Sequence, residues 1–193
     1  MAIELAEETM TALPEYARVP IVFTVDRMLE VTNRHDGSGG FVLSERRVEV
    51  PYEKDYDAVA GEGPSQWGRC FDLSNWALFT ARAANRIVGG ATIAFDTPGL
   101  TMLEGRRDLA VLWDIRVSPE LRRQGVGAAL FHRAEGWAQL RGCRQLKIET
   151  QNTNVRACRF YERHGCQLRA IHRAAYADLP DEIQLLWYKD LQH

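Results

Sequence analysis

Residues 117–128 read Val-Ser-Pro-Glu-Leu-Arg-Arg-Gln-Gly-Val-Gly-Ala, a junction between two regular elements. The apolar pattern of Leu109–Val117 predicts a strand before it, and the helical periodicity of Val126–Leu140 predicts a helix after it. Gly125 and Gly127 therefore lie at the mouth of a helix. Glycines there let backbone N–H groups approach an anion, and the positive end of the helix dipole favours negative charge.

This junction is suited to bind phosphate. Arg122 and Arg123 add positive charge, and each backbone bond to a phosphate oxygen contributes on the order of 1.5–3 kcal/mol. A dinucleotide fingerprint needs a third glycine where Leu130 lies, and a Walker loop needs Gly-Lys-Ser/Thr, so neither applies. A simple tight turn is the structural alternative. The predicted phosphate-binding residues are Arg122, Arg123, Gln124, Gly125, Val126, Gly127 and Ala128.

Strands alternate with helices through the rest of the chain. We expect strands at Val19–Val25 with Met28–Val31, and at Phe41–Val50, Trp76–Ala83, Ile87–Phe95, Gln145–Thr150, Leu168–Tyr176 and Ile183–Tyr188. A second long helix is expected at Asn154–His164, a loop at Pro51–Gly68 and a short helix near Asp72. The order predicts a mixed α/β domain with a helix on each crossover. We expect one domain over residues 1–193, with a less regular arm at 1–40 and a core at about 76–191.

The composition excludes several classes of protein. The 193 residues are 46% hydrophobic, enough for a core, and the formal net charge of −2 predicts no nucleic-acid partner. The acidic N-terminus is unlike a signal peptide, and no apolar run approaches a membrane span. Four cysteines match no metal pattern, so we expect reduced thiols, no metal and a cytoplasmic protein.

Two motifs together identify a family. Residues 122–127, Arg-x-x-Gly-x-Gly, resemble the coenzyme A pyrophosphate loop of the GNAT N-acetyltransferase superfamily. Residues 154–165, Asn-x-x-Ala-x-x-Phe-Tyr-x-x-x-Gly, resemble its next motif. The resemblance implies an α/β (α+β) fold, the GNAT acyltransferase fold, with a mixed central sheet splayed between two strands and helices on both faces. It also implies acetyl coenzyme A as acyl donor, and a homodimer as a common arrangement, although no interface signal stands out.

A narrower likeness covers roughly residue 41 to the end. Residues 149–161 and 51–56, with Ala175-Tyr176 and Trp187-Tyr188, are similar to streptothricin acetyltransferases. Those enzymes tend to have an acidic residue where this chain has Trp113, Asp-Thr where it has His172-Arg173, and phenylalanine at Cys166. The first two departures replace negative charge by bulk or positive charge near the expected acceptor pocket.

The resemblance also assigns cofactor contacts. An open strand edge at Ile115, Arg116 and Val117 would pair with the pantetheine arm, and the N–H of Val117 would face the thioester carbonyl. Asn154 would hydrogen-bond the same arm, with Ala157 beside it in the cofactor-binding set.

Acetyl transfer to an amine needs a base and an acid. An alkyl amine has a pKa of about 10.4, so holding it neutral at pH 7 costs roughly 4.6 kcal/mol. The candidate bases are Asp114 and Glu149, and Asp114 is slightly preferred. Strand alternation would place Asp114 on the face opposite Trp113 and Ile115. Tyr161 is the expected general acid toward the thiolate. A core tyrosine, a paired strand carboxylate and a surface carboxylate are the structural alternatives.

Three functions fit the sequence. The first is direct transfer, in a ternary complex, from acetyl coenzyme A to a primary amine of a small polar molecule such as a streptothricin-like or aminoglycoside-like antibiotic. The second is acetylation of a peptide or protein amine. The third is a non-catalytic acyl-coenzyme A-binding regulator, which the presence of Tyr161 disfavours. The acidic loop from Glu49 to Glu62 favours a cationic acceptor, with a simple solvated loop as the structural alternative.

Overall fold

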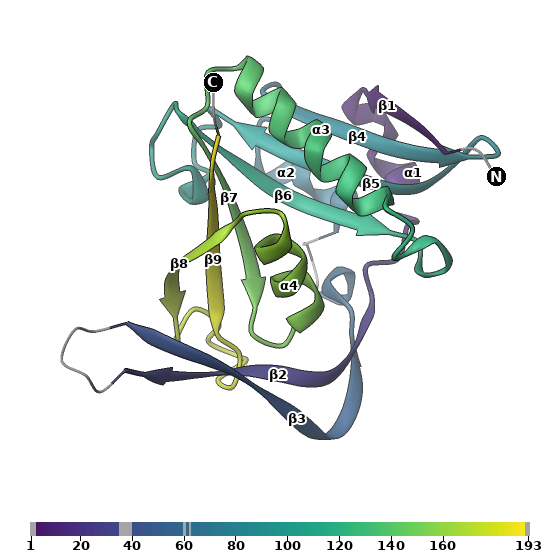
Figure 1. Ribbon diagram of the computed structural model, residues 1–193. Coiled ribbons are helices and arrows are strands. Elements are labelled where there is room, and N and C mark those ends of the chain that lie inside the picture. The colour runs from purple at the N-terminus through teal and green to yellow at the C-terminus, as the bar shows by residue number, and fades with distance from the viewer. Residues whose placement is uncertain (1–2, 35–39, 60, 62, 192–193) are drawn as a thin grey trace. The chain divides into compact units, whose positions relative to one another are not determined.

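Strands rich in Val, Ile, Phe and Trp run through the chain, and in the computed structural model they fall into two units (Figure 1). The structure describes residues 3–34, 40–59, 61 and 63–191. The first unit consists of Met1–Val22, Asp55–Ile148 and Tyr188–His193, and the second of Phe23–Lys54 and Glu149–Trp187. Strands β7 (Gln145–Gln151) and β9 (Gln184–Asp190) contribute residues to both. The expectation of a single domain remains a prediction.

The first unit is built on a sheet in which the neighbouring strands are β1-β4-β5-β6-β7. All pairs are antiparallel except β6 and β7, which run parallel. The strands are β1 (Glu4–Glu8), β4 (Trp76–Ala83), β5 (Arg86–Phe95) and β6 (Leu109–Val117). The helices are α1 (Leu13–Tyr16), α2 (Trp67–Cys70) and α3 (Val126–Leu140). The 3-10 turns are η1 (Met10–Ala12), η2 (Tyr56–Ala58), η3 (Pro64–Gln66), η4 (Thr101–Leu103) and η5 (Pro119–Leu121).

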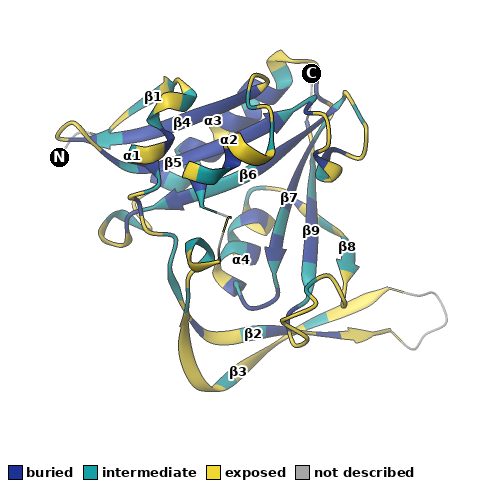
Figure 2. Ribbon diagram, turned by 180° about the vertical axis from the view of Figure 1, so that it is seen from behind, coloured by how far each residue is buried: buried dark blue, intermediate teal, exposed yellow. Residues whose placement is uncertain are grey.

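Helices cover both faces of this sheet. Helix α3 packs along β4, β5 and β6 on one face (Figure 1). On the other face, α1 and α2 cover the strands (Figure 2), and Tyr16, Trp67, Trp76 and Leu78 belong to one buried apolar cluster there. Strand side chains alternate between two faces, and residues 76–81 of β4 are all buried, so both faces of this strand are covered.

Tyr16 packs directly onto β5 at Gly90. Its side chain is fully buried, and a Cβ added at Gly90 would lie 2.5 Å from Tyr16 Cε2 and 2.7 Å from Phe79 O. We expect Gly90→Ala to lower the free energy of unfolding by about 1–3 kcal/mol, because the ring and the strand must move apart. Urea unfolding measures the change.

The matched control for this substitution is Gly136→Ala. Gly136 lies inside α3, and nothing approaches within 4 Å of a Cβ added there. Alanine is a better helix former, so we expect this variant to be neutral or more stable by about 0.5–1 kcal/mol. Equal unfolding midpoints for the two variants would contradict the close packing of Tyr16 on β5.

The second unit contains a long hairpin and a helix. Strands β2 (Phe23–Asn33) and β3 (Phe41–Lys54) pair antiparallel, with a register shift between Val25 and Arg27. Helix α4 (Val155–Arg163) has Asn154 as its N-cap. Strand β8 (Gln167–His172) completes the order β7-β9-β8.

Several predicted boundaries need correction. The short helix expected near Asp72 is α2, which ends at Cys70; Asp72 Oδ1 then accepts a 2.9 Å hydrogen bond from Ser74 N and closes a local turn. The predicted loop at Pro51–Gly68 begins later, since β3 continues to Lys54. The predicted strand Leu168–Tyr176 ends at His172.

Candidate active site

The loop before α3 leaves the helix N-terminus open. Arg123 and Gly125 adopt left-handed φ values of 63° and 85°, and a Cβ added at Gly125 would have nothing within 4 Å. Among the described residues, no side chain caps this helix. The first-turn N–H groups are therefore directed toward open space, and they can donate to an anion.

The two arginines of the loop differ in their surroundings. Arg122 Nε donates to Val117 O at 2.9 Å, and its Nη2 donates to Val22 O at 3.1 Å. Arg122 thus fastens the loop to the end of β6 and to the residues that follow α1. Arg123 is exposed, and Gln124 Nε2 bonds Glu120 O at 2.9 Å. The expected phosphate contacts of all three residues remain predictions.

Strand β6 has an open edge in its second half. It pairs with β5 as far as Val117, but in the described chain its pairing with β7 covers Leu109–Leu112. The backbone groups of Ile115–Val117 on that edge have no partner strand in β7. An extended chain can add to such an edge by backbone hydrogen bonds, which is the geometry expected for pantetheine.

A bulge in β6 overturns the predicted facing of Asp114. Thr92 lies opposite Asp114 while Ile93 lies opposite Leu112, so Trp113 is an extra residue on β6. A bulge interrupts the alternation of side chains. Trp113 packs against Trp67 and Trp76, and Asp114 accepts a hydrogen bond from Tyr16 of that same cluster. Both side chains are therefore on the α1/α2 face.

Asp114 accepts three hydrogen bonds from two residues. Arg116 Nε and Nη2 reach its two carboxylate oxygens at 2.9 and 2.7 Å, and the Tyr16 hydroxyl also donates to it. Burial, and then the negative charge of Asp114, raise the pKa of Tyr16 well above its ordinary value, so this phenol stays protonated. A proton on Asp114 would neutralise its ion pair with Arg116.

The remaining predicted catalytic residues lie in the second unit. Glu149 Oε1 accepts a 2.7 Å hydrogen bond from the Tyr176 hydroxyl, which in turn accepts one from Gln151 Nε2 at 3.0 Å. Tyr161 lies on α4 and is 5% exposed. The roles of Glu149 as a base and of Tyr161 as the general acid remain predictions.

Asn154 and Ala157 are joined by the helix cap. Asn154 Oδ1 accepts a 3.1 Å hydrogen bond from Ala157 N, which satisfies one of the first N–H groups of α4. The cap fixes where α4 begins. It also occupies the side-chain oxygen of Asn154 and the N–H of Ala157, so their predicted cofactor contacts would involve other atoms.

The four cysteines are free thiols. Burial raises the pKa of Cys143 and of Cys158 to about 11, which disfavours the thiolate that a nucleophile requires. No group of three or more potential metal ligands occurs among the described residues, and none of the helices in those ranges is long and apolar enough to cross a membrane.

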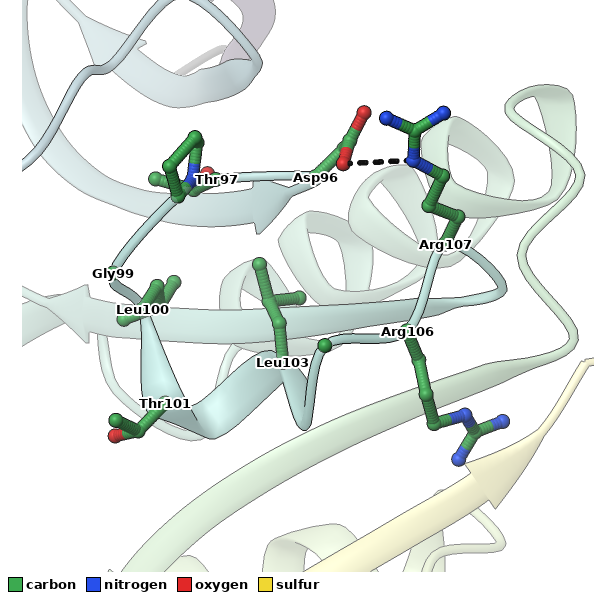
Figure 3. Close-up of a pocket in the computed structure, with 10 residues that line it drawn as sticks. Asp96, Thr97, Gly99, Leu100, Thr101, Leu103, Arg106 and Arg107 are labelled. Carbon is green, nitrogen blue, oxygen red and sulfur yellow. Dashed lines mark ion pairs between the residues drawn. The ribbon is translucent and has the colours of Figure 1, made fainter.

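One hollow lies away from these residues. The segment between β5 and β6 encloses about 320 Å³ (Figure 3). Arg107 reaches across it to Asp96 at 3.3 Å, whereas Arg106 points away to Asp108. The hollow adjoins the start of β6, and the open edge belongs to the other end of this strand, so it is separate from the candidate site.

Comparison with known proteins gives a consistent set of relatives. The profile of the acetyltransferase (GNAT) family matches residues 44–166. Streptothricin acetyltransferase A of Bacillus subtilis (strain 168) is 29% identical over 153 residues, 78% of this chain and 80% of that protein. A streptothricin acetyltransferase of Escherichia coli is 31% identical over 163 residues, 82% of each chain.

Solved structures with the same architecture include nourseothricin acetyltransferase, with a TM-score of 0.76 at 24% identity over 100% of both chains. A Bacillus anthracis str. Ames protein, assigned as a streptothricin acetyltransferase and solved with acetyl coenzyme A, has the same TM-score and identity over 100% of this chain and 99% of that one. At this identity the likeness concerns the fold, and the fold predicted from the sequence is confirmed.

Proposed function

This chain belongs to the acetyltransferase (GNAT) family, and from that premise we propose that it acetylates a primary amine of a small polar molecule, with streptothricin as the first candidate. As a family member it is an N-acetyltransferase that uses acetyl coenzyme A. The acceptor and the roles of single residues are the proposal.

The uncapped start of α3 supports the proposed binding of acetyl coenzyme A, the acetyl donor. With Gly125 at φ 85° and open space in front of it, the first-turn N–H groups fit a diphosphate. The open edge of β6 at Ile115–Val117 would take the pantetheine arm, with the N–H of Val117 directed at the thioester carbonyl. The bound donor would supply the activated acetyl group for direct transfer in a ternary complex.

Glu149 is favoured over Asp114 as the base. Both oxygens of Asp114 are engaged by Arg116, and Tyr16 adds a third hydrogen bond. Glu149 is partly exposed and accepts one hydrogen bond, from a neutral phenol. It can take up a proton without breaking an ion pair. Tyr161 would then protonate the departing thiolate, as a phenol of pKa about 10 can do.

A small cationic acceptor is supported by the acidic segment that follows β3. Asp55 is exposed and Asp57 is partly exposed on it, and Glu53 is exposed just before it. Clustered negative charge raises the local concentration of a cationic amine. The likeness to streptothricin acetyltransferases over most of the chain points to the same acceptor class.

A thiol-release assay with acetyl coenzyme A tests the proposal. The panel holds streptothricin, an aminoglycoside, a polyamine and a peptide with a free N-terminus. We expect kcat/KM for streptothricin or the aminoglycoside to exceed that for the peptide by on the order of 10²-fold or more. Preference for the peptide would contradict the proposal, and N-acetylated streptothricin is the blank.

A further inference from the structure

We infer that Arg116 is a positioning residue: through Asp57 it ties η2 to the bulged half of β6 and so fixes the acceptor side of the site. The inference rests on the proposed function, because the expected effect of the Arg116–Asp57 ion pair is on binding of the acceptor amine. Arg116, Asp57 and Asp114 all belong to the first unit.

The guanidinium of Arg116 uses all of its donors inside the protein. Nε and Nη2 bond Asp114, Nη1 and Nη2 bond Asp57 at 2.5 and 3.1 Å, and Nη1 also bonds Val19 O at 3.2 Å. A guanidinium has five N–H groups, so each one has an acceptor here. The side chain is 1% exposed, and it therefore joins three chain segments rather than reaching for a phosphate.

The Tyr16 ring completes the enclosure of this charge. It lies 5.2 Å from the guanidinium carbon, within the range of a cation–π contact. Burial opposes the charge on Arg116, but the hydrogen bonds that it donates to Asp114 outweigh burial and raise the pKa of Arg116 above its usual value. Arg116 stays charged and holds both carboxylates.

The carboxylates of Asp114 and Asp57 differ in their burial and in the stability of the segment that carries them. The Asp114 side chain is 7% exposed and sits on a central strand, whereas that of Asp57 is 27% exposed on η2. None of the three residues of η2 is buried. Its backbone bonds, Ala58 N to Asp55 O and Val59 N to Tyr56 O, are both long at 3.4 Å. The ion pair to Arg116 therefore anchors η2, together with the 3.0 Å hydrogen bond from Asp57 N to Asp55 Oδ1.

The group formed by Arg116, Asp57 and Asp114 also keeps a negative charge at its exposed end. Two carboxylates share one guanidinium, and the neighbouring phenol of Tyr16 is neutral, so the group carries one net negative charge. Asp57 is its most exposed part. Near a cationic amine this charge favours binding, while the fixed position of η2 limits the shapes that can approach.

Asp57→Asn is the variant that separates these roles. It removes the charge that holds η2 but leaves Arg116 paired with Asp114, so the buried guanidinium is not orphaned. With streptothricin as the amine, we expect its KM to rise about 10-fold or more, with kcat and the KM for acetyl coenzyme A within about 3-fold of wild type. Asp57→Glu, which restores the charge, should recover part of the loss.

Hydrogen–deuterium exchange tests the tie without turnover. In Asp57→Asn without substrate, we expect the amides of Ala58 and Val59 to exchange about 10-fold faster, because the ion pair that anchors η2 to Arg116 is gone. Asp72→Asn is the control, since it makes the same charge change at an exposed turn. Failure of wild type to acetylate any amine would count against the proposed function, whereas unchanged exchange would overturn the tie itself. Unchanged streptothricin KM, or equal rises in both KM values, would overturn its effect on the acceptor.

Discussion

Gly125→Val is expected to raise the Kd for acetyl coenzyme A by at least about 100-fold. Valine is strained at a left-handed φ of 85°, and its branched side chain would enter the open space in front of α3. Losing two backbone bonds to phosphate at about 1.5–3 kcal/mol each corresponds to roughly 10²–10⁴-fold in affinity. Isothermal titration calorimetry with acetyl coenzyme A measures the change.

Gly99→Val is the matched control. Gly99 has a φ of 79°, and nothing lies within 4 Å of a Cβ added there, but it belongs to the segment between β5 and β6. It therefore reports the cost of backbone strain without blocking the start of α3. We expect its affinity for acetyl coenzyme A to be that of wild type. A wild-type Kd for Gly125→Val, or equal losses in the two variants, would contradict the phosphate site.

Tyr161→Phe should lower kcat by on the order of 10²-fold or more, with the Kd for acetyl coenzyme A nearly unchanged. The substitution removes one hydroxyl and keeps the buried ring of α4 in place. If this hydroxyl protonates the leaving thiolate, its loss slows chemistry and spares binding. Steady-state kinetics for kcat and calorimetry for Kd separate the two.

Tyr188→Phe controls for the loss of any tyrosine hydroxyl. The Tyr188 hydroxyl donates to Glu104 in the first unit and has no proposed catalytic role. Its kcat should stay within about 3-fold of wild type. Full activity of Tyr161→Phe would remove Tyr161 from the mechanism.

Elements with strong local patterns could be predicted from the sequence. The bounds of β6 and α3 agree with the predicted strand and helix, because continuous apolar pattern, Ser118-Pro119 and the glycines mark their ends. Strand β1 was not predicted, since three of its five residues are glutamates and it exists through pairing with β4, from Glu4 opposite Arg82 to Glu8 opposite Leu78. Such pairing between residues seventy or more positions apart leaves no local signal.

The site shows the same limit. The proposed phosphate-binding loop is a contiguous motif, and its glycine conformation follows from residue type. The bulge at Trp113 depends on the register with β5. Strict alternation of side chains along the strand, as assumed from the sequence, therefore placed Asp114 on the wrong face. The partners of Arg116 come from α1, η2 and β6, and the acidic loop that contains Asp57 was visible only as negative charge.

A crystal structure with acetyl coenzyme A would locate the diphosphate directly. We expect its oxygens within about 2.7–3.2 Å of the backbone nitrogens of Val126, Gly127 and Ala128. A diphosphate bound elsewhere, or the start of α3 filled by another side chain such as that of Arg123, would contradict a phosphate site built from the helix N-terminus.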